Sequence, residues 1–278
     1  MISEIISEKY DSMSKTHRVI ANFVLKNLTD TSYMSIKELS ERTGAGEATI
    51  IRFCTKLGYE GYPEFKSALR YELSTKDSIT DRLRESYMAY EGRGAGIAQM
   101  LQDDMRRIEK TLANLDMSAF FDICNRLTNA SKIYIIASRS TASLGSFFQY
   151  YLNMALGNVE LISDLGCKAD LLCSVTKDDV VIGITFYRYT KGTVELFQYA
   201  KEKGANTIAI TDSQVSPLIQ YSDAYLLADT SMPSYLDSFV APLSIINAIL
   251  AEIGRQGNIQ LEERIDELDD FYKKYDIF

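Results

Sequence analysis

Apolar and polar positions change rhythm twice along the 278-residue chain. Up to about residue 75, apolar side chains recur at helical spacing. Residues 76–98 are polar and include Gly92, Gly94 and Gly96, a pattern that favours a linker with a short helix near residues 79–87. A further helix is expected from residue 97 to about residue 114. The pattern therefore predicts two domains joined by a partly helical linker.

The C-terminal part alternates short β-branched runs with helical patterns. The runs are nearly continuous in Ile, Val, Leu or Tyr, which is typical of strands that are buried on both faces of a parallel sheet. Helical segments such as residues 193–203 lie between them, and closing helices are expected at residues 234–254 and 259–275. Strand–helix–strand repetition predicts right-handed crossovers. The expected strands are residues 132–137, 158–162, 179–185, 207–211 and 224–228.

The expected fold class is an all-α N-terminal domain followed by a three-layer α/β domain with a parallel five-stranded sheet. We assign the first domain to residues 1–77, the linker to residues 78–106 and the second domain to residues 107–278. With 46% hydrophobic and 24% charged residues, the composition is ordinary for a soluble globular protein.

Membrane insertion and secretion have no support in the sequence. The first residues include Glu4 and Glu8, where a secretory signal is basic. The longest apolar stretch, residues 239–253, is interrupted by polar residues and is typical of a buried helix. We expect a cytoplasmic protein without a membrane partner.

Metal chemistry is not indicated either. His17 is the only histidine, and a zinc site needs a cluster of histidines or cysteines. We expect no metal and no cofactor, and thiols that suit a reducing compartment. The cysteines, which have no CxxC spacing, are Cys54, Cys124, Cys167 and Cys173.

The net charge of −8 argues at first sight against nucleic-acid binding. Residues 1–80, however, hold 11 Lys+Arg and 11 Asp+Glu, so the excess acid lies in the remainder of the chain. Net charge governs solubility and non-specific association, and it leaves one local face free to contact phosphates. The N-terminal domain is therefore compatible with specific DNA binding, and its non-specific binding is expected to be weak.

The strongest local pattern lies at residues 35–57. Ser35 and Glu38 have the spacing of a capping box, which marks the start of a helix. A glycine-containing turn follows at residues 44–46, and a second helix is predicted over residues 47–57. These are the parts of a helix-turn-helix, although an ordinary helical hairpin has the same spacing.

The second of these helices has two distinct faces. One face is an apolar stripe at i, i+3, i+4 and i+7, formed by Ile50, Phe53, Cys54 and Leu57. A recognition helix needs such a stripe to fix its angle and a slim polar face to enter the major groove. The opposite face is small at first and basic further on, with Ala48, Thr49, Arg52, Thr55 and Lys56.

Residues 34–44 and the run EATIIRFCTKLGYEGYPEFK at residues 47–66 resemble the N-terminal domain of the RpiR family of transcription regulators. Together with the helix expected at residues 14–27, the resemblance covers residues 9–73. Many relatives have a serine where this chain has Gly46, which tolerates the N-cap position but supplies no hydroxyl.

The resemblance implies a double-stranded DNA operator as partner. Thr49 and Arg52 would approach bases in the major groove, while lysines would contact phosphates. The candidate DNA-binding residues are Ser35, Lys37, Glu47, Ala48, Thr49, Arg52, Lys56 and Lys66.

Two loops of the second domain carry hydroxyls and an arginine at the expected carboxyl end of a strand. Residues 138–143 follow the first strand, residues 185–190 follow the third, and each loop leads into a helix. Helix N-termini and arginine favour anions there. The pair favours a phosphate site over the alternative of capping hydroxyls and solvated arginines. The candidate ligand-binding residues are Ser138, Arg139, Ser140, Thr141, Thr185, Tyr187, Arg188 and Thr190.

Residues 133–229 resemble the SIS domain, the sugar-phosphate-binding fold that the RpiR family carries behind its DNA-binding domain. Thr141 falls where that fold has its first phosphate-binding serine, and residues 185–190 fall on its Ser-x-Ser-Gly-x-Thr loop. The runs at residues 204–213 and 216–218 also resemble the family. Arg139 and Arg188 stand where the fold has glycine, and Tyr187 stands where it has serine. The ligand is therefore expected to differ from a simple hexose phosphate, or the site to be partly degenerate.

Three functions are compatible with these features. The favoured one is a transcription regulator of carbohydrate metabolism, not an enzyme, whose operator affinity is controlled by a sugar phosphate or similar phosphorylated metabolite. The alternatives are a sugar-phosphate isomerase with an accessory helical domain, and a SIS domain used only for dimerisation. An isomerase needs a general acid or base. His17 is far in sequence from the loops and nothing singles out Glu160 or Glu195, so no catalytic residue is assigned.

A helix-turn-helix regulator that reads a pseudo-palindrome is expected to be a homodimer or homotetramer. The apolar helix at residues 234–253 is a candidate dimer contact, and the glycine-containing stretch at residues 91–96 is the expected hinge. Ligand can shift DNA affinity only by its differential affinity for the two forms, typically ~1–3 kcal/mol.

Overall fold

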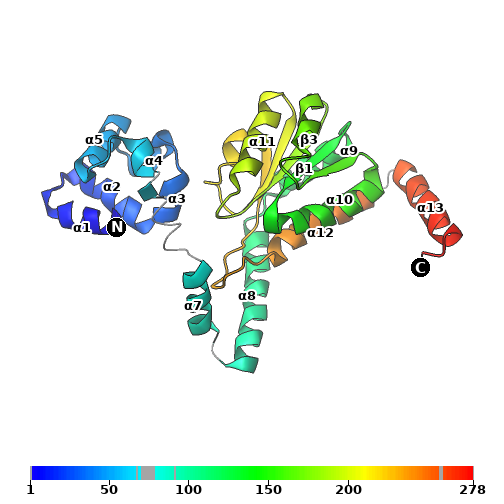
Figure 1. The fold of residues 1–278 in the computed structure, drawn as a ribbon, viewed down its shortest axis with the longest axis horizontal. Coiled ribbons are helices and arrows are strands. Elements are labelled where there is room, and N and C mark those ends of the chain that lie inside the picture. The colour runs from blue at the N-terminus through cyan, green and yellow to red at the C-terminus, as the bar shows by residue number, and fades with distance from the viewer. Residues whose placement is uncertain (1, 67, 70–78, 91, 257–258, 278) are drawn as a thin grey trace. The chain divides into compact units, whose positions relative to one another are not determined.

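The computed structural model describes residues 2–66, 68–69, 79–90, 92–256 and 259–277. The chain divides into two compact units, one spanning residues 1–89 with 233–235 and the other spanning residues 90–232 with 236–278. The boundary expected between residues 77 and 78 falls outside the described residues. Figure 1 shows the elements of both units.

The helices of the first unit are α1 (Ile2–Lys9), α2 (Lys15–Lys26), α3 (Leu28–Tyr33), α4 (Ile36–Thr43), α5 (Glu47–Leu57) and α7 (Ile79–Ala89), and residues 62–66 and 68–69 are also helical. Those of the second are α8 (Arg93–Ala113), α9 (Met117–Thr128), α10 (Ala142–Leu156), α11 (Lys191–Glu202), α12 (Val240–Arg255) and α13 (Ile259–Lys274). Its strands are β1 (Ile133–Ala137), β2 (Val159–Ile162), β3 (Val180–Ile184), β4 (Asn206–Thr211) and β5 (Ala224–Leu227).

The first unit is helical, as expected, and its helix ends follow the sequence. The Ser35 hydroxyl accepts a hydrogen bond from the Glu38 N–H at 3.2 Å, while the Glu38 carboxylate accepts one from the Ser35 N–H at 2.6 Å. This capping box starts α4. Gly44 ends the helix in the left-handed conformation, with φ of 67°, which glycine adopts without steric cost.

The sheet of the second unit has the strand order β2-β1-β3-β4-β5, and every pair is parallel. The prediction of a five-stranded parallel sheet is therefore confirmed, with strand ends that differ by about one residue. Asp179 was expected to start β3 but precedes it, because its carboxylate accepts hydrogen bonds from the N–H and the hydroxyl of Thr176 at 2.8 and 2.9 Å.

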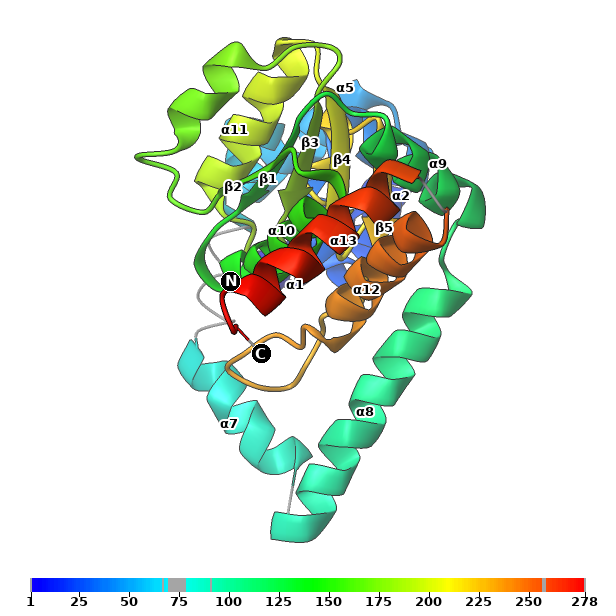
Figure 2. The same ribbon diagram turned by 90° about the vertical axis from the view of Figure 1, so that its right-hand side faces the viewer.

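Helices cover both faces of this sheet, as Figures 1 and 2 show. Alternate strand residues such as Ile135 and Ile182 pack with α9, α10 and α12 in one apolar cluster. Their neighbours, such as Ile136 and Val181, pack with Phe197 of α11 in a second cluster. The three-layer α/β architecture follows from these two cores. No helix among the described residues is long and apolar enough to cross a membrane.

The structure differs from the expected secondary structure in two places. The helix expected from residue 234 begins only at Val240, because residues 229–239 form an irregular segment that hydrogen-bonds to other elements. The stretch expected as a hinge is largely helical, since Gly94 and Gly96 lie inside the first turn of α8. A Cβ on Gly96 would lie 2.9 Å from the Tyr90 carbonyl oxygen, so the glycine serves close packing.

Candidate functional sites

Helix α5 is fixed by the apolar stripe that the sequence predicts. Gly46 occupies the N-cap position, and its carbonyl accepts hydrogen bonds from the N–H groups of Thr49 and Ile50 at 2.8 and 3.1 Å. All four residues of the stripe are buried: Ile50, Phe53, Cys54 and Leu57. The ring of Phe53 packs edge-on against His17 of α2 and against Phe65. The helix therefore presents a single, fixed outer face.

That outer face carries four of the eight residues predicted to contact DNA. Glu47, Ala48 and Arg52 are exposed and Thr49 is half-buried. The Arg52 Nε donates to the Ala48 carbonyl at 3.2 Å, so the guanidinium lies along the helix and adds a positive charge to its surface. The small side chain of Ala48 leaves the start of the helix slim, which entry into a major groove requires.

The other predicted contacts fall in different settings. Lys37 is exposed on α4, while the Ser35 hydroxyl is engaged in the capping box. The Lys56 ammonium donates to the Ser12 carbonyl, so a phosphate contact by Lys56 requires it to leave that partner. Lys66 is half-buried and makes interactions of its own. Arg52 and Lys37 are thus the predicted cations most accessible to phosphates.

The pKa of His17 is affected by the positive charges near this surface. Burial lowers the pKa of its imidazole, and the neighbouring charges of Lys56 and Arg52 lower it further. A neutral His17 that packs on Phe53 is a structural residue of the helical unit, which agrees with its distance in sequence from the α/β loops.

In the α/β unit, strand order determines where a ligand crevice can form. From β1 the chain continues to β2 on one side of the sheet, while β3 lies on the other side of β1. Helices α10 and α11, which follow β1 and β3, pack on opposite faces of the sheet. Their loops diverge at the carboxyl ends of these two strands, the place where open parallel sheets of this order bind ligands.

Two hydroxyls of the first loop, those of Ser138 and Thr141, make hydrogen bonds that brace it. Thr141 donates to the Ser138 carbonyl at 2.8 Å and lies 3.2 Å from the Ile184 carbonyl at the end of β3. The Ser138 and Thr193 hydroxyls share a hydrogen bond of 2.9 Å, which ties the loop to α11. In this arrangement the Thr141 hydroxyl hydrogen is used internally, so an anion would meet backbone N–H groups and Ser140, which is exposed.

The second loop is braced in the same way. The Thr185 hydroxyl accepts a hydrogen bond from the Thr190 N–H at 3.2 Å, which fixes the start of α11. The Thr185 carbonyl accepts one from the Thr211 hydroxyl at 2.7 Å. The Tyr187 N–H donates to the Asp212 carboxylate at 3.3 Å. These bonds join the ends of β3 and β4 into one rigid edge.

Each loop places one arginine at a position of unusual backbone geometry. Arg139 has φ of 57° and Arg188 has φ of 66°, both in the left-handed region, and both side chains are exposed. Among the described residues, no hydrogen bond or ion pair engages either guanidinium. Left-handed backbone in residues other than glycine clusters at functional sites. The edge therefore carries two available cations beside two helix N-termini.

Asp212 is a residue of this edge that the sequence analysis missed as a site residue. It follows β4 directly, and burial raises the pKa of its carboxyl, while hydrogen bonds from Tyr189 and other groups act in the opposite direction. The family resemblance of residues 204–213 indicated this strand end. Asp212 was not chosen as a site residue, because an anion site is expected to lack carboxylates.

Two cavities among the described residues, of about 360 and 470 Å³, open at the amino end of the sheet, beside residues 128–131 and 156–158, and so lie at the opposite end from the loops after β1 and β3. Within the described ranges, no group of His, Cys, Asp or Glu is arranged to hold a metal ion.

Comparison with known proteins matches both units. Residues 1–76 match the model of the helix-turn-helix domain of the rpiR family, and residues 126–252 match that of the SIS domain. An uncharacterized HTH-type transcriptional regulator of Haemophilus influenzae is 29% identical over 252 residues, which are 88% of this chain and 87% of that protein. The transcriptional regulator HexR of Escherichia coli is 26% identical over 249 residues, 87% of this chain and 81% of HexR.

Solved structures share the fold. NanR of Vibrio vulnificus, solved in complex with ManNAc-6P, covers 99% of both chains with a TM-score of 0.69 at 20% identity. The sugar isomerase domain of an RpiR transcription factor from Sphaerobacter thermophilus covers 62% of this chain and 97% of its own, with a TM-score of 0.60 at 25% identity. With the capped helix-turn-helix and the parallel sheet, these matches show that the chain belongs to the RpiR family, in which a helix-turn-helix domain precedes a SIS domain.

Proposed function

We propose that this protein is a DNA-binding transcription regulator whose operator affinity is controlled by a phosphorylated sugar. The observation that supports DNA binding best is α5, whose buried stripe fixes an exposed face of Ala48 and Arg52. Thr49 and Arg52 would read base edges, and Lys37 would contact a phosphate. Relatives that align with most of the chain are named transcriptional regulators.

We place the effector at the carboxyl edge of β1 and β3. The exposed guanidiniums of Arg139 and Arg188 and the N-termini of α10 and α11 favour a phosphate group there. Backbone N–H groups would bind it, since the Thr141 hydroxyl donates internally. The fold shared with NanR, which was solved with ManNAc-6P, supports a sugar phosphate as the ligand class.

An isomerase finds less support in the geometry. Glu160 lies on β2 and pairs with Lys132 at 4.0 Å, and Glu195 lies on the exposed side of α11 and pairs with Lys191 at 3.4 Å. Neither belongs to the loops that follow β1 and β3. We therefore propose that the protein returns its sugar phosphate unchanged, which incubation with sugar phosphates and analysis of the products would test.

A dimer is the form that a pseudo-palindromic operator requires. Most apolar residues of α12 are buried in the core of their own unit, although Val240 is 37% exposed, so this helix offers little apolar surface for the contact expected there. Helix α8 instead exposes Ile97, Leu101, Met105 and Leu112, each by 59–62%. At 100° per residue, these four side chains fall within one narrow stripe. We propose that the α8 helices of two copies pair through this stripe.

The direct test of the proposed function is operator selection from random DNA duplexes with the full-length protein. We expect a pseudo-palindromic sequence to be enriched, and Arg52→Ala to lose it while the helical unit remains folded. Enrichment of no sequence, or equal enrichment by the variant, would contradict the assignment of α5.

A further inference from the structure

The irregular segment between β5 and α12, residues 228–239, is attached to the edge where we place the effector. The Ala228 N–H donates to the Thr211 carbonyl at the end of β4, at 2.8 Å. At the other end of the segment, the Phe239 ring packs on Phe186, with ring centroids 5.8 Å apart. Phe186 is buried inside the loop that follows β3, between Thr185 and Tyr187. A change in the conformation of that loop would therefore act directly on the segment through the contact between Phe186 and Phe239.

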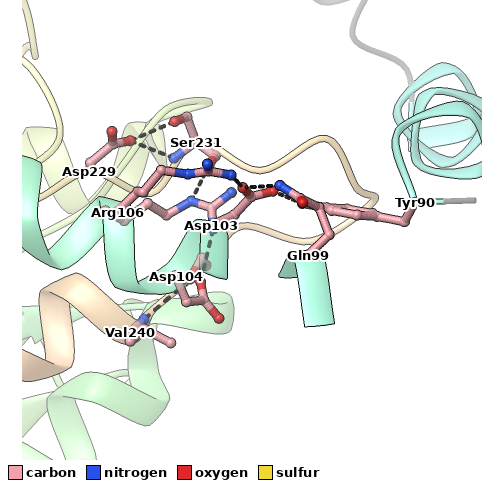
Figure 3. Close-up of polar contacts among 10 residues, drawn as sticks. Tyr90, Gln99, Asp103, Asp104, Arg106, Asp229, Ser231 and Val240 are labelled. Carbon is pink, nitrogen blue, oxygen red and sulfur yellow. Dashed lines mark hydrogen bonds and ion pairs between the residues drawn. The ribbon is translucent and has the colours of Figure 1, made fainter. Parts of the chain in front are cut away.

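The same segment is hydrogen-bonded to α8. Arg107 of α8 donates through Nε to the Ser231 carbonyl, and its Nη1 lies 2.9 Å from the Asp104 carboxylate. The Asp104 oxygen also accepts a hydrogen bond of 2.6 Å from the Ser238 hydroxyl. Figure 3 labels Asp104 of α8 and Asp229 and Ser231 of the segment. We call Asp104, Arg107, Ser231 and Ser238 the α8 clamp.

A second set of bonds fixes the start of the segment to the same helix. Lys110 pairs with the Asp229 carboxylate at 2.6 Å, and the Asp229 N–H donates to the Thr111 hydroxyl at 3.1 Å. The Asp229 carboxylate in turn accepts hydrogen bonds from the N–H and the hydroxyl of Ser231. Bonds from α8 thus reach residues 229, 231 and 238 along the segment.

The burial of the clamp makes it a rigid connection. The Arg107 side chain is only 7% exposed, and the Asp104 side chain is 21% exposed. A buried charge that loses a partner is strongly unfavourable, so these contacts break together or move together. The segment and α8 are consequently expected to shift as one body when the loop after β3 moves.

We propose that the route from Phe186 through Phe239 and Ser238 to the α8 clamp couples effector binding to α8. In the chain, α8 directly follows the DNA-binding unit. A bound effector would therefore act on DNA binding by changing the position of α8. This inference rests on the proposed function and adds the residues through which its regulation acts. The contacts along this route are continuous in space. A loss of coupling in variants of these residues would show that the route also carries the coupling free energy.

The test compares variants in the full-length protein. Ser238→Ala removes one hydrogen bond of the clamp, and Arg107→Lys keeps the charge but removes the Nε donor. The matched control is Arg106→Ala, because Arg106 is the neighbouring arginine, is 61% exposed and pairs with Asp103 within α8. Calorimetry measures the affinity for ManNAc-6P, glucose 6-phosphate and 6-phosphogluconate, and fluorescence anisotropy measures the affinity for the selected operator with and without each compound.

We expect at least one compound to change the operator affinity of the wild type by about 5- to 150-fold, the usual range of allosteric coupling. Ser238→Ala and Arg107→Lys should bind compound and operator separately with nearly wild-type affinity, and should lose most of that change. Arg106→Ala should keep it. Ser238→Ala is the milder variant and decides the outcome if Arg107→Lys does not fold.

The possible failures are distinguishable. If no compound binds the wild type or alters its operator affinity, the proposed function is wrong and this inference falls with it. If the wild type responds and both clamp variants respond equally, the inference alone is wrong. If Ser238→Ala loses affinity for the compound itself, the clamp belongs to the binding site and the inference is again overturned.

Discussion

Arg139 and Arg188 adopt matching left-handed backbone conformations, with φ of 57° and 66°, in the loops that follow the neighbouring strands β1 and β3. Such backbone costs a residue other than glycine roughly 1–2 kcal/mol. The loops therefore keep a geometry suited to glycine and add a guanidinium to each. Strain at the edge where we propose the effector supports a role for these two side chains in binding.

Two substitutions of Arg188 distinguish the effect of the backbone strain from the effect of the guanidinium charge. Arg188→Gly and Arg188→Ala both remove the guanidinium, but only glycine relieves the left-handed backbone, so we expect the glycine variant to be more stable by about 1 kcal/mol. Both should weaken binding of a sugar phosphate alike. Urea denaturation and calorimetry measure the two effects. Equal stability of the variants would show that the loop relaxes without strain.

Arg52 and Lys37, the most accessible of the cations predicted to contact DNA, should behave differently. Arg52→Ala should weaken binding to the operator by ~1–3 kcal/mol and relax its sequence preference. Lys37→Ala should weaken binding to all sequences alike and reduce the salt dependence, the slope of log K against log salt concentration, by about one. Anisotropy titrations at several salt concentrations measure both. An unchanged salt slope in Lys37→Ala would remove that lysine from the phosphate contacts.

Asp212 should make the stability of the protein depend on pH. Because burial raises the pKa of its carboxyl above the ordinary value of 3.8, the folded state holds the proton to higher pH than the unfolded state. The proton's contribution to stability is complete below pH 3.8 and is lost as pH rises through the raised pKa. Asp212→Asn should therefore gain melting temperature relative to the wild type as pH rises from about 4 to neutral.

The same variant tests whether the carboxylate faces the ligand. Removal of a negative charge from the edge should strengthen phosphate binding, and Asp122→Asn on the exposed side of α9 is the matched control. If the melting-temperature difference between Asp212→Asn and wild type is constant over this pH range, Asp212 does not have a raised pKa.

The stripe on α8 should set the oligomeric state. Leu101→Glu with Met105→Glu places charges at two positions that are 61% and 62% exposed, so the folded monomer should tolerate them while pairing of two copies should fail. Gln102→Glu, next to the stripe, is the control. Sedimentation velocity should show the wild type and the control as dimers and the double variant as a monomer. A dimeric double variant would place the interface elsewhere.

Much of the fold could be predicted because each element has a local cause. The capping box of Ser35 and Glu38, the stripe of α5 and the five β-branched runs each determine their element without help from distant residues. The two errors have the opposite character. Residues 234–239 were expected to be helical, but Ser238 hydrogen-bonds to Asp104 of α8. Gly94 and Gly96 lie in the first turn of α8, where the chain packs closely between Gly96 and Tyr90.

The candidate effector edge was predictable in position but not in detail. Hydroxyls and arginines after two strands indicated an anion, yet sequence does not reveal that Thr141 donates to the Ser138 and Ile184 carbonyls. Nor does it reveal that Asp212 accepts from the Tyr187 N–H, or that Phe186 meets Phe239. Apart from the bond between Thr141 and Ser138, which lie in one loop, each of these contacts joins residues from different strands or segments, so only the folded chain brings them together.

A sugar phosphate bound at the β1/β3 edge should change the affinity of the protein for DNA. This is tested by the operator affinity of the full-length protein across a panel of sugar phosphates, for the wild type and for Arg139→Ala with Arg188→Ala. We expect one compound to shift the wild-type affinity, and the double variant to bind operator normally without responding. A compound that shifts both proteins equally, or a panel that shifts neither, would contradict it.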